Sequence, residues 1–153
     1  MNRIAELLPE SRVAVSLDAA TKRDLFASIA GMFERDGGLA RNLVVDALAA
    51  REKLGSTGLG QGIAIPHGRI KGLMDARGAF VRLAQPIAFD APDGRPVSQV
   101  FVLLVPEHAT ERHLELLSEL AQMFSERSFR DRLAASPDAH SAWTVIRDWV
   151  ATA

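Results

Sequence analysis

One short run of apolar residues sets the architecture of this chain. Val100–Val105 reads VFVLLV, six consecutive apolar residues rich in β-branched types, and Pro106 ends the run. A strand with one face in water alternates apolar and polar side chains, so an uninterrupted run is typical of a strand buried on both faces. Such a strand requires one layer of structure above the sheet and another below it.

Helical patterns in the first third of the chain supply one of these layers. Thr21 is a good N-cap, and Asp24 three residues later completes a pattern like a capping box. Apolar side chains then recur at helical spacing, at Leu25, Ile29 and Phe33. The pair Gly37-Gly38 ends this helix. A second helix is predicted to begin after Asn42, another favoured cap.

Weaker signals complete the outline before the central run. A short helix is expected over Asn2–Leu8, stopped near Pro9. Further strands are expected at Arg12–Val15, Ile63–Ile65 and Ala79–Leu83. The pair Asp93-Gly94 is typical of a turn tip.

Helices are also predicted after the central run. In one of them His113 shares an apolar face with Leu117, Leu120 and Phe124. Ser136-Pro137-Asp138 is a strong helix start, with a cap, a proline at the first position and an acid near the helix dipole. Three apolar residues of that last helix are expected to face inward, namely Ala142, Ile146 and Val150.

This order of elements predicts an α/β fold. We expect a three-layer α/β/α sandwich with a small mixed β-sheet, because helices precede and follow a strand that needs cover on both faces. A length of 153 residues indicates one domain, spanning residues 1–153.

The composition excludes several classes of function. The formal charge is only −1 and no basic stripe appears, so no nucleic-acid partner is expected. There are no cysteines, which excludes disulfides, thiolate zinc sites and cysteine nucleophiles and fits a reducing compartment. No run approaches the ~18 apolar residues of a membrane span, and Glu6 and Pro9 interrupt any signal-peptide core. We expect a cytoplasmic domain without membrane insertion.

The stretch Arg51–Gly68, REKLGSTGLGQGIAIPHG, carries the candidate chemistry. Three alternating glycines precede a short β-like run, and Pro66 cuts that run off and places His67 before Gly68. A histidine fixed behind a proline, beside a loop rich in backbone N–H groups, is a candidate nucleophile. Imidazole attacks phosphorus well near neutral pH, because a large fraction of it is unprotonated.

Two polar residues stand at the ends of apolar helical stripes. Arg51 continues the face of Val44 and Leu48, and His113 lies in the first turn of its helix. Arg51 is either an arginine whose stem covers the edge of the core or an anion clamp beside the glycine loop. His113 is either a half-buried histidine satisfied by the backbone or a second imidazole at a helix N-terminus, where anions are favoured.

Other candidate chemistry is weaker. His108 and His113 lie five residues apart, no other histidine pair has spacing typical of metal ligands, and no metal site is expected. His140 is expected to be solvated. The glycines match neither a dinucleotide fingerprint nor a P-loop, and no cofactor is expected. The basic stretch Arg69–Lys71, expected to be irregular, is either a partner-docking patch or a solvated loop.

The motif resembles a known active-site signature. REKLGSTGLGQGIAIPHG is similar to that of the IIA domains of the bacterial phosphoenolpyruvate-dependent phosphotransferase system, in the mannitol/fructose family. Ile63–Gly68 meets its ending of apolar, Ala, apolar, Pro, His, Gly, and Leu103–Phe124 resembles its second-histidine region. The resemblance implies a three-layer sandwich in which His67 is phosphorylated and His113 and Arg51 support it. The backbone of the glycine loop would then hold the phosphoryl oxygens, with contributions from Ser56, Thr57, Gly58, Gly60 and Gly68.

The resemblance also implies partners. The motif and Ala91–Val97 are most similar to nitrogen-regulatory members of the family. Such members accept phosphate from a phosphocarrier protein and regulate targets such as potassium transporters or sensor kinases according to their phosphorylation state. Two alternatives stay open: a sugar-specific IIA component that passes phosphate to a permease IIB subunit, and a binding module without phosphotransfer.

Overall fold

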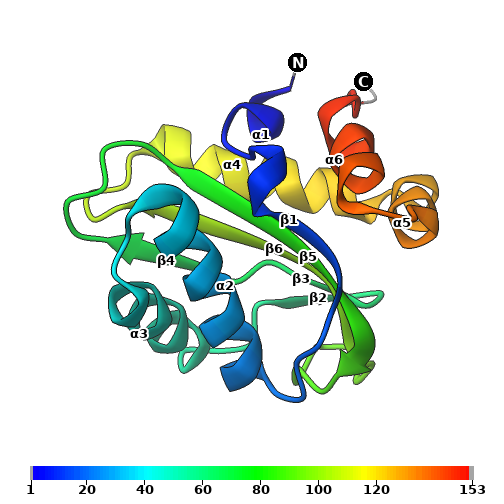
Figure 1. The fold of residues 1–153 in the computed structure, drawn as a ribbon, viewed down its shortest axis with the longest axis horizontal. Helices are drawn as coiled ribbons and strands as arrows, with labels where there is room; N and C mark the ends of the chain where they lie inside the picture. The colour runs from blue at the N-terminus through cyan, green and yellow to red at the C-terminus, as the bar shows by residue number, and fades with distance from the viewer. Residues whose placement is uncertain (1, 152–153) are drawn as a thin grey trace.

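A mixed six-stranded sheet forms the middle of the molecule (Figure 1). The computed structural model describes residues 2–151. The strands are β1 (Val13–Leu17), β2 (Gly58–Gly60), β3 (Ile63–Ala64), β4 (His67–Ile70), β5 (Arg77–Ile87) and β6 (Val97–Pro106). Their order is β1-β5-β6-β3-β2, and β4 also pairs with β6. β5 and β6 are antiparallel, whereas β3 and β4 both run parallel to β6.

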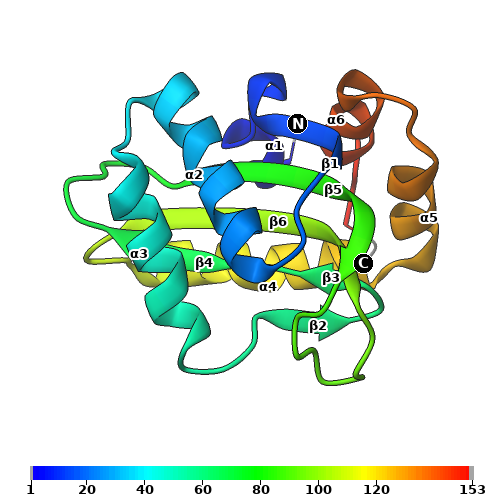
Figure 2. The same cartoon turned by 60° about the horizontal axis from the view of Figure 1, so that its bottom comes forward.

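Strand β6 occupies the centre of the sheet, as the apolar run predicted. Figure 2 shows β6 between β5 on one side and β4 on the other. The side chains of Val100–Leu104 are completely buried. Their directions alternate: Val100, Val102 and Leu104 pack on one face of the sheet, and Phe101, Leu103 and Val105 on the other. One strand therefore contributes to two hydrophobic cores.

Helices cover both faces of the sheet, which confirms the predicted three-layer α/β/α fold (Figures 1 and 2). One face carries α2 (Lys22–Gly37) and α3 (Arg41–Glu52). The other carries α1 (Arg3–Glu6), α4 (Glu111–Ser125), α5 (Arg127–Ala135) and α6 (Ala139–Arg147). A short 3-10 helix, Glu10–Arg12, precedes β1. Among the described residues, each helix is too short or too polar to cross a bilayer.

The helix caps agree with the sequence in part. The Thr21 side chain accepts a hydrogen bond from the Asp24 amide, and Gly38 ends α2 in the left-handed conformation, both as predicted. The predicted start of the next helix after Asn42 is wrong, since α3 begins at Arg41 and its N-cap Ala40 makes no side-chain hydrogen bond. Packing of its apolar face on the sheet, rather than a cap, stabilises this helix end.

Two predictions about the last helix are wrong. Asp138, not Ser136, is its N-cap and accepts from the Ser141 amide. Ser136 is instead the C-cap of α5, and its hydroxyl donates to the Arg132 carbonyl in the last turn of that helix. Val150 does not face inward: 77% of its surface is exposed, because α6 ends at Arg147 and the helical phase is lost.

Strand β4 includes Arg69 and Ile70, so the expectation that Arg69–Lys71 is irregular is wrong for these two residues. His67–Ile70 pairs in parallel with Leu103–Pro106, and the Pro66 carbonyl accepts from the Leu103 amide. β3 and β4 thus lie in succession along β6, separated by a proline that has no N–H to offer the sheet. This arrangement makes His67 the first residue of a strand whose far end, Ile70, is completely buried.

Candidate functional site

The backbone just before β4 holds the ring of His67 in place. Its Nδ1 lies 2.9 Å from the carbonyl oxygen of Ile65. A carbonyl oxygen only accepts, so Nδ1 carries the proton in this contact and the neutral ring keeps its lone pair on Nε2. The backbone geometry around Pro66 thereby selects the tautomer of His67.

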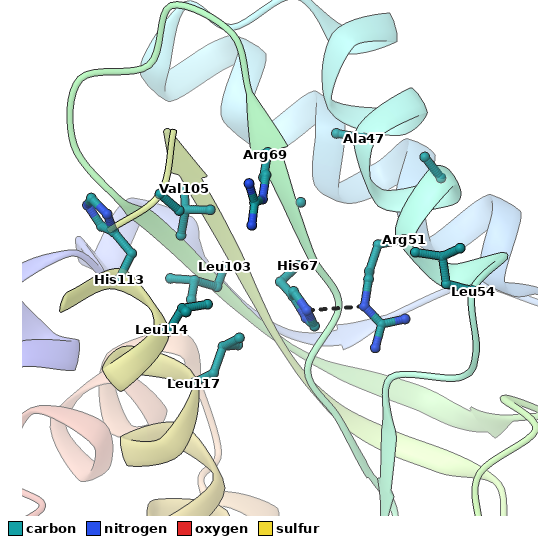
Figure 3. Close-up of a pocket in the computed structure, with 13 residues that line it drawn as sticks. Ala47, Arg51, Leu54, His67, Arg69, Leu103, Val105, His113, Leu114 and Leu117 are labelled. Atoms are coloured by element: carbon teal, nitrogen blue, oxygen red, sulfur yellow. Dashed lines mark hydrogen bonds between the residues drawn. The ribbon is translucent and has the colours of Figure 1, made fainter. Parts of the chain in front are cut away.

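Arg51 is in contact with Nε2, the unprotonated nitrogen of that ring. Its Nε donates to Nε2 of His67 over 3.3 Å, as the dashed line in Figure 3 marks. Its Nη1 donates to the Gly55 carbonyl at 2.8 Å. Held at both ends, the guanidinium from the last turn of α3 stands beside the imidazole.

Gly68 allows this approach. A Cβ on Gly68 would lie 3.0 Å from the Ala47 Cβ and 3.1 Å from the Ala47 backbone. Contacts of that length are tighter than side chains ordinarily tolerate, so only glycine lets α3 lie directly on β4. The close packing of helix and strand brings Arg51 to His67, which are remote in sequence.

Burial and charge lower the pKa of His67. Removal of the half-buried imidazole from water is the largest cause, and the positive charge of Arg51 acts in the same direction. The hydrogen bond to Ile65 and the charge of Glu52 oppose the shift. The pKa of His67 lies below the ordinary histidine value of 6.5, so the ring is neutral at pH 7.

His67 opens into a cleft of about 460 Å³ between α3 and α4 (Figure 3). Its walls are mainly apolar, with Leu103 and Val105 from β6 and Leu114 and Leu117 from α4 among them. The polar groups in the cleft are Arg51, His67, Arg69 and His113. A mainly apolar cleft with a few convergent polar groups is typical of a small-molecule binding site.

His113 lies in the same cleft but is not in contact with His67. The amide of Thr110 donates to its Nδ1 at 3.0 Å, which completes a capping box at the start of α4. Figure 3 shows its ring pointing away from His67. Because Nδ1 accepts a hydrogen bond, the neutral ring carries its proton on Nε2 and retains a donor.

The glycine loop lies outside the cleft. The Ser56 hydroxyl donates to the Phe89 carbonyl and accepts from the Gly58 amide. The Thr57 hydroxyl and amide both donate to the Glu52 carboxylate. Gly60, with φ 89°, faces the Asp93 carboxylate. Of the residues predicted to hold phosphoryl oxygens through the glycine loop and its surroundings, the structure brings only Gly68 to the cleft, and the cleft is not lined by Ser56, Thr57, Gly58 or Gly60.

Arg69 lines the cleft, although the sequence left Arg69–Lys71 open between a partner-docking patch and a solvated loop. It follows His67 by two positions on β4 and so faces the same side of the sheet. Its Nη1 donates to the Glu107 carbonyl at 3.4 Å, and its head group lies over the cleft in Figure 3. Side chains alternate between the two faces of a strand, so recognition of this four-residue strand in the sequence would have predicted that Arg69 lies on the same side as His67.

The remaining histidines do not join this site. His108 is almost fully exposed and lies near Glu107, and His140 bonds to Glu10. Within residues 2–151, no cluster of three or more histidine, aspartate or glutamate side chains is arranged to hold a metal ion.

Comparisons with known proteins agree with this fold and motif. The family profile described as "Phosphoenolpyruvate-dependent sugar phosphotransferase system, EIIA 2" matches residues 6–149. The chain therefore belongs to the type-2 EIIA family of the phosphotransferase system. Within that family it is similar to nitrogen regulatory proteins: it is 42% identical to that of Pseudomonas aeruginosa over 149 residues, covering 97% of each chain.

Solved structures give the same result. The crystal structure of the nitrogen regulatory protein IIA-Ntr from Neisseria meningitidis superimposes with a TM-score of 0.89 at 48% identity, covering 95% of this chain and 99% of that one. The mannitol IIA protein of Escherichia coli, in complex with phosphorylated mannitol IIB, superimposes with a TM-score of 0.76 at 19% identity, covering 94% and 100%. At that identity the second likeness concerns the fold alone.

Proposed function

We propose that this chain, which spans a IIA domain, acts as a cytoplasmic phosphohistidine carrier and regulator. It accepts a phosphoryl group on His67 from a phosphocarrier protein of the nitrogen-related phosphotransferase system, and its phosphorylation state controls target proteins. The observation that carries this proposal is the His67 ring: its Nδ1 is hydrogen-bonded to the backbone, and its unprotonated Nε2 accepts from Arg51 at the cleft. The similarity to nitrogen regulatory proteins supports the regulatory part.

The geometry supports in-line transfer to Nε2. The lone pair of Nε2 attacks phosphorus as the P–N bond of the donor's phosphohistidine breaks, and the electron pair of that bond returns to the donor's imidazole. Nδ1 keeps its proton throughout, so the Ile65 carbonyl stabilises the positive charge that the phosphorylated ring acquires. No proton has to leave His67 during the step.

Arg51 is the principal oxygen-binding group in this mechanism. Its guanidinium donates to Nε2 in the free protein and turns to the phosphoryl oxygens when phosphorus occupies that nitrogen. His113 has an Nε2–H donor and reaches the same oxygens after rotation of its ring, and Gly68 keeps the backbone close. Catalysis is then positioning plus electrostatic stabilisation.

The rim of the cleft supports docking of another protein. Leu54 at the end of α3 and Leu114 on α4 are 83% and 54% exposed, although both are large apolar side chains. They stand beside the cleft that holds His67. Exposed apolar side chains around a polar centre are typical of a protein-docking surface. We assign this rim to the phosphocarrier protein and to regulated targets such as potassium transporters or sensor kinases.

Phosphorylation by the upstream proteins tests the proposal. The protein is incubated with phosphoenolpyruvate, an enzyme I homologue and the phosphocarrier, and its intact mass is measured. We expect one acid-labile phosphoryl group on the wild type and none on His67→Ala, whereas the control His140→Ala is labelled normally because His140 lies outside the cleft. Full labelling of His67→Ala would refute the assignment.

A sugar-specific role is the second candidate, because the family profile that matches the chain is described for a sugar phosphotransferase system. The same labelled protein, mixed with a IIB domain and its sugar permease, distinguishes the two. Phosphorylation of the sugar at a rate comparable to that of a sugar-specific IIA protein would favour the second candidate.

A further inference from the structure

A buried carboxylate stands next to the candidate site without entering it. Glu52 follows Arg51 in α3, and its side chain is only 9% exposed. A carboxylate is removed from water at considerable cost unless donors surround it. Three donors do so: Lys22 Nζ at 2.9 Å, the Thr57 amide at 3.1 Å and the Thr57 hydroxyl at 2.7 Å.

Hydrogen bonds connect this carboxylate to the ring of His67. The carbonyl of Thr57 accepts from the Ile65 amide at 3.0 Å. The carbonyl of Ile65 in turn accepts from Nδ1 of His67 at 2.9 Å. Glu52 therefore fixes Thr57, Thr57 fixes the backbone of Ile65, and Ile65 fixes the protonated nitrogen of His67.

Lys22 links helix α2 to the Glu52 carboxylate. It lies at the start of α2, and its Nζ stands 4.6 Å from the centre of the Phe89 ring while it pairs with Glu52. The Phe89 carbonyl accepts from the Ser56 hydroxyl. Hydrogen bonds with α2 and with the Phe89 segment therefore hold the loop between Glu52 and Ile65. The Glu52 carboxylate accepts those of Lys22 and Thr57.

We propose that Glu52 is a positioning residue for the transfer step. Through Thr57 and Ile65 it holds His67 in the Nδ1–H tautomer and so keeps the lone pair on Nε2, facing the cleft. This inference rests on the proposed function of His67 as the phosphate acceptor. A residue that merely anchored α2 to α3 would affect stability and leave the tautomer unchanged.

The tautomer is measured directly in the unphosphorylated protein. Long-range ¹H–¹⁵N NMR spectra distinguish a ring protonated on Nδ1 from one protonated on Nε2. In wild type we expect the Nδ1–H form of His67. In Glu52→Gln we expect a mixture with the Nε2–H form, and phosphorylation by the carrier slowed on the order of tenfold to a hundredfold, because misplaced reacting groups lose rate steeply.

Two further variants make the test decisive. Glu34→Gln removes an exposed carboxylate that pairs with Arg41 on the surface, and it is expected to keep both tautomer and rate. Thr57→Val removes only the hydroxyl bond to Glu52 and keeps the amide and the side-chain shape, so it is expected to shift the tautomer in the same direction as Glu52→Gln. Thr57→Val also tests the proposal if Glu52→Gln does not fold.

The proposal is overturned if the folded variants keep the Nδ1–H tautomer and the wild-type rate. It is also overturned if stability falls while the tautomer stays unchanged, since Glu52 is then only an anchor. Failure of the wild type to accept phosphate would contradict the proposed function instead, and the tautomer measurement, which needs no phosphate donor, would still decide the part played by Glu52.

Discussion

At the scale of single residues, the site depends on the hydrogen bonds made by the two ring nitrogens of His67. Nδ1 of His67 is engaged by the Ile65 carbonyl, and Nε2 meets a guanidinium that is itself fixed by Gly55. Partial burial and a cation beside the ring both favour the neutral form. In the proposed transfer, the same arginine contributes to keeping His67 unprotonated before the step and is placed to bind the phosphoryl oxygens afterwards.

Arg51→Ala separates these two effects. Loss of the positive charge is expected to raise the pKa of His67, because Arg51 lowers it in the wild type. Phosphoryl transfer is expected to slow by roughly 10²-fold, as when one preorganised donor to a reacting oxygen is removed. NMR titration of the His67 ring gives the pKa, and single-turnover labelling gives the rate.

The matched control is Arg41→Ala, which removes an exposed arginine from the other end of the same helix. It is expected to leave both quantities unchanged, and both variants to unfold at nearly the wild-type denaturant concentration. A large loss of stability in Arg51→Ala alone would instead indicate that Arg51 serves the edge of the core.

At the scale of elements, the site is made by contact between α3 and β4. Neither element carries the site alone: α3 brings Arg51, β4 brings His67 and Arg69, and Gly68 sets their separation. The helix lies on the strand because one position on each, Ala47 and Gly68, is small. The spacing of Arg51 and His67 is therefore a packing property and depends on residues that carry no chemistry.

Gly68→Ala is expected to force α3 away from β4. The new Cβ would lie 3.0 Å from the Ala47 Cβ, and such overpacking costs about 1–3 kcal/mol. Denaturant unfolding measures the loss of stability, and labelling by the carrier measures a slower transfer as Arg51 moves from His67.

Ala47→Gly in the Gly68→Ala background removes the nearest of these contacts, at 3.0 Å, and leaves those with the backbone of residue 47 at 3.1 Å. Glycine within a helix also costs about 1 kcal/mol, so we expect the transfer rate to recover in part while much of the stability loss remains. Recovery of stability without recovery of rate would contradict the packing explanation.

The elements that could be predicted from sequence are those with local signals. The apolar run of β6 and the Thr21 cap of α2 depend on residues that are neighbours in the sequence, so the positions predicted for them are correct. β4 was missed because its pairing partner, the end of β6, is distant in the chain and its own four residues mix charge with apolar character. Formation of such a strand is decided by the sheet edge that accepts it.

The candidate site was predictable to a similar extent. The motif placed His67 and Arg51 in one region, and the structure brings them into hydrogen-bond contact. The direction of His113 was not predictable, because it follows from the competition of the Thr110 amide for Nδ1. The inward direction of the Ser56 and Thr57 side chains likewise depends on Phe89 and Glu52, which no local pattern connects to them.

At the scale of the whole molecule, the cleft and its apolar rim make one face of the protein suited to a partner. Leu114→Glu places a charge on this rim without disturbing the core, because Leu114 is exposed. We expect KM for the phosphocarrier to rise roughly tenfold, equivalent to about 1.4 kcal/mol of binding, with little change in kcat. Steady-state labelling at several carrier concentrations measures both.

The control for this variant is Val150→Glu, at an apolar residue that is 77% exposed and lies outside the cleft. Its KM is expected to equal that of the wild type. Equal increases in the two variants would mean that the added negative charge repels the carrier nonspecifically and that the rim is not the docking surface.

The division of the interior into two cores has a consequence for how such a protein can evolve. Ala47, behind Arg51, packs with the core under α2 and α3, whereas Leu117, on the opposite wall of the cleft, packs with the core under α4. The two walls of the cleft are thus supported by different cores, which pack on opposite faces of the same sheet. We expect substitutions on the exposed surface of α4 to change the choice of partner while the Arg51–His67 contact, made by α3 and β4, keeps its geometry.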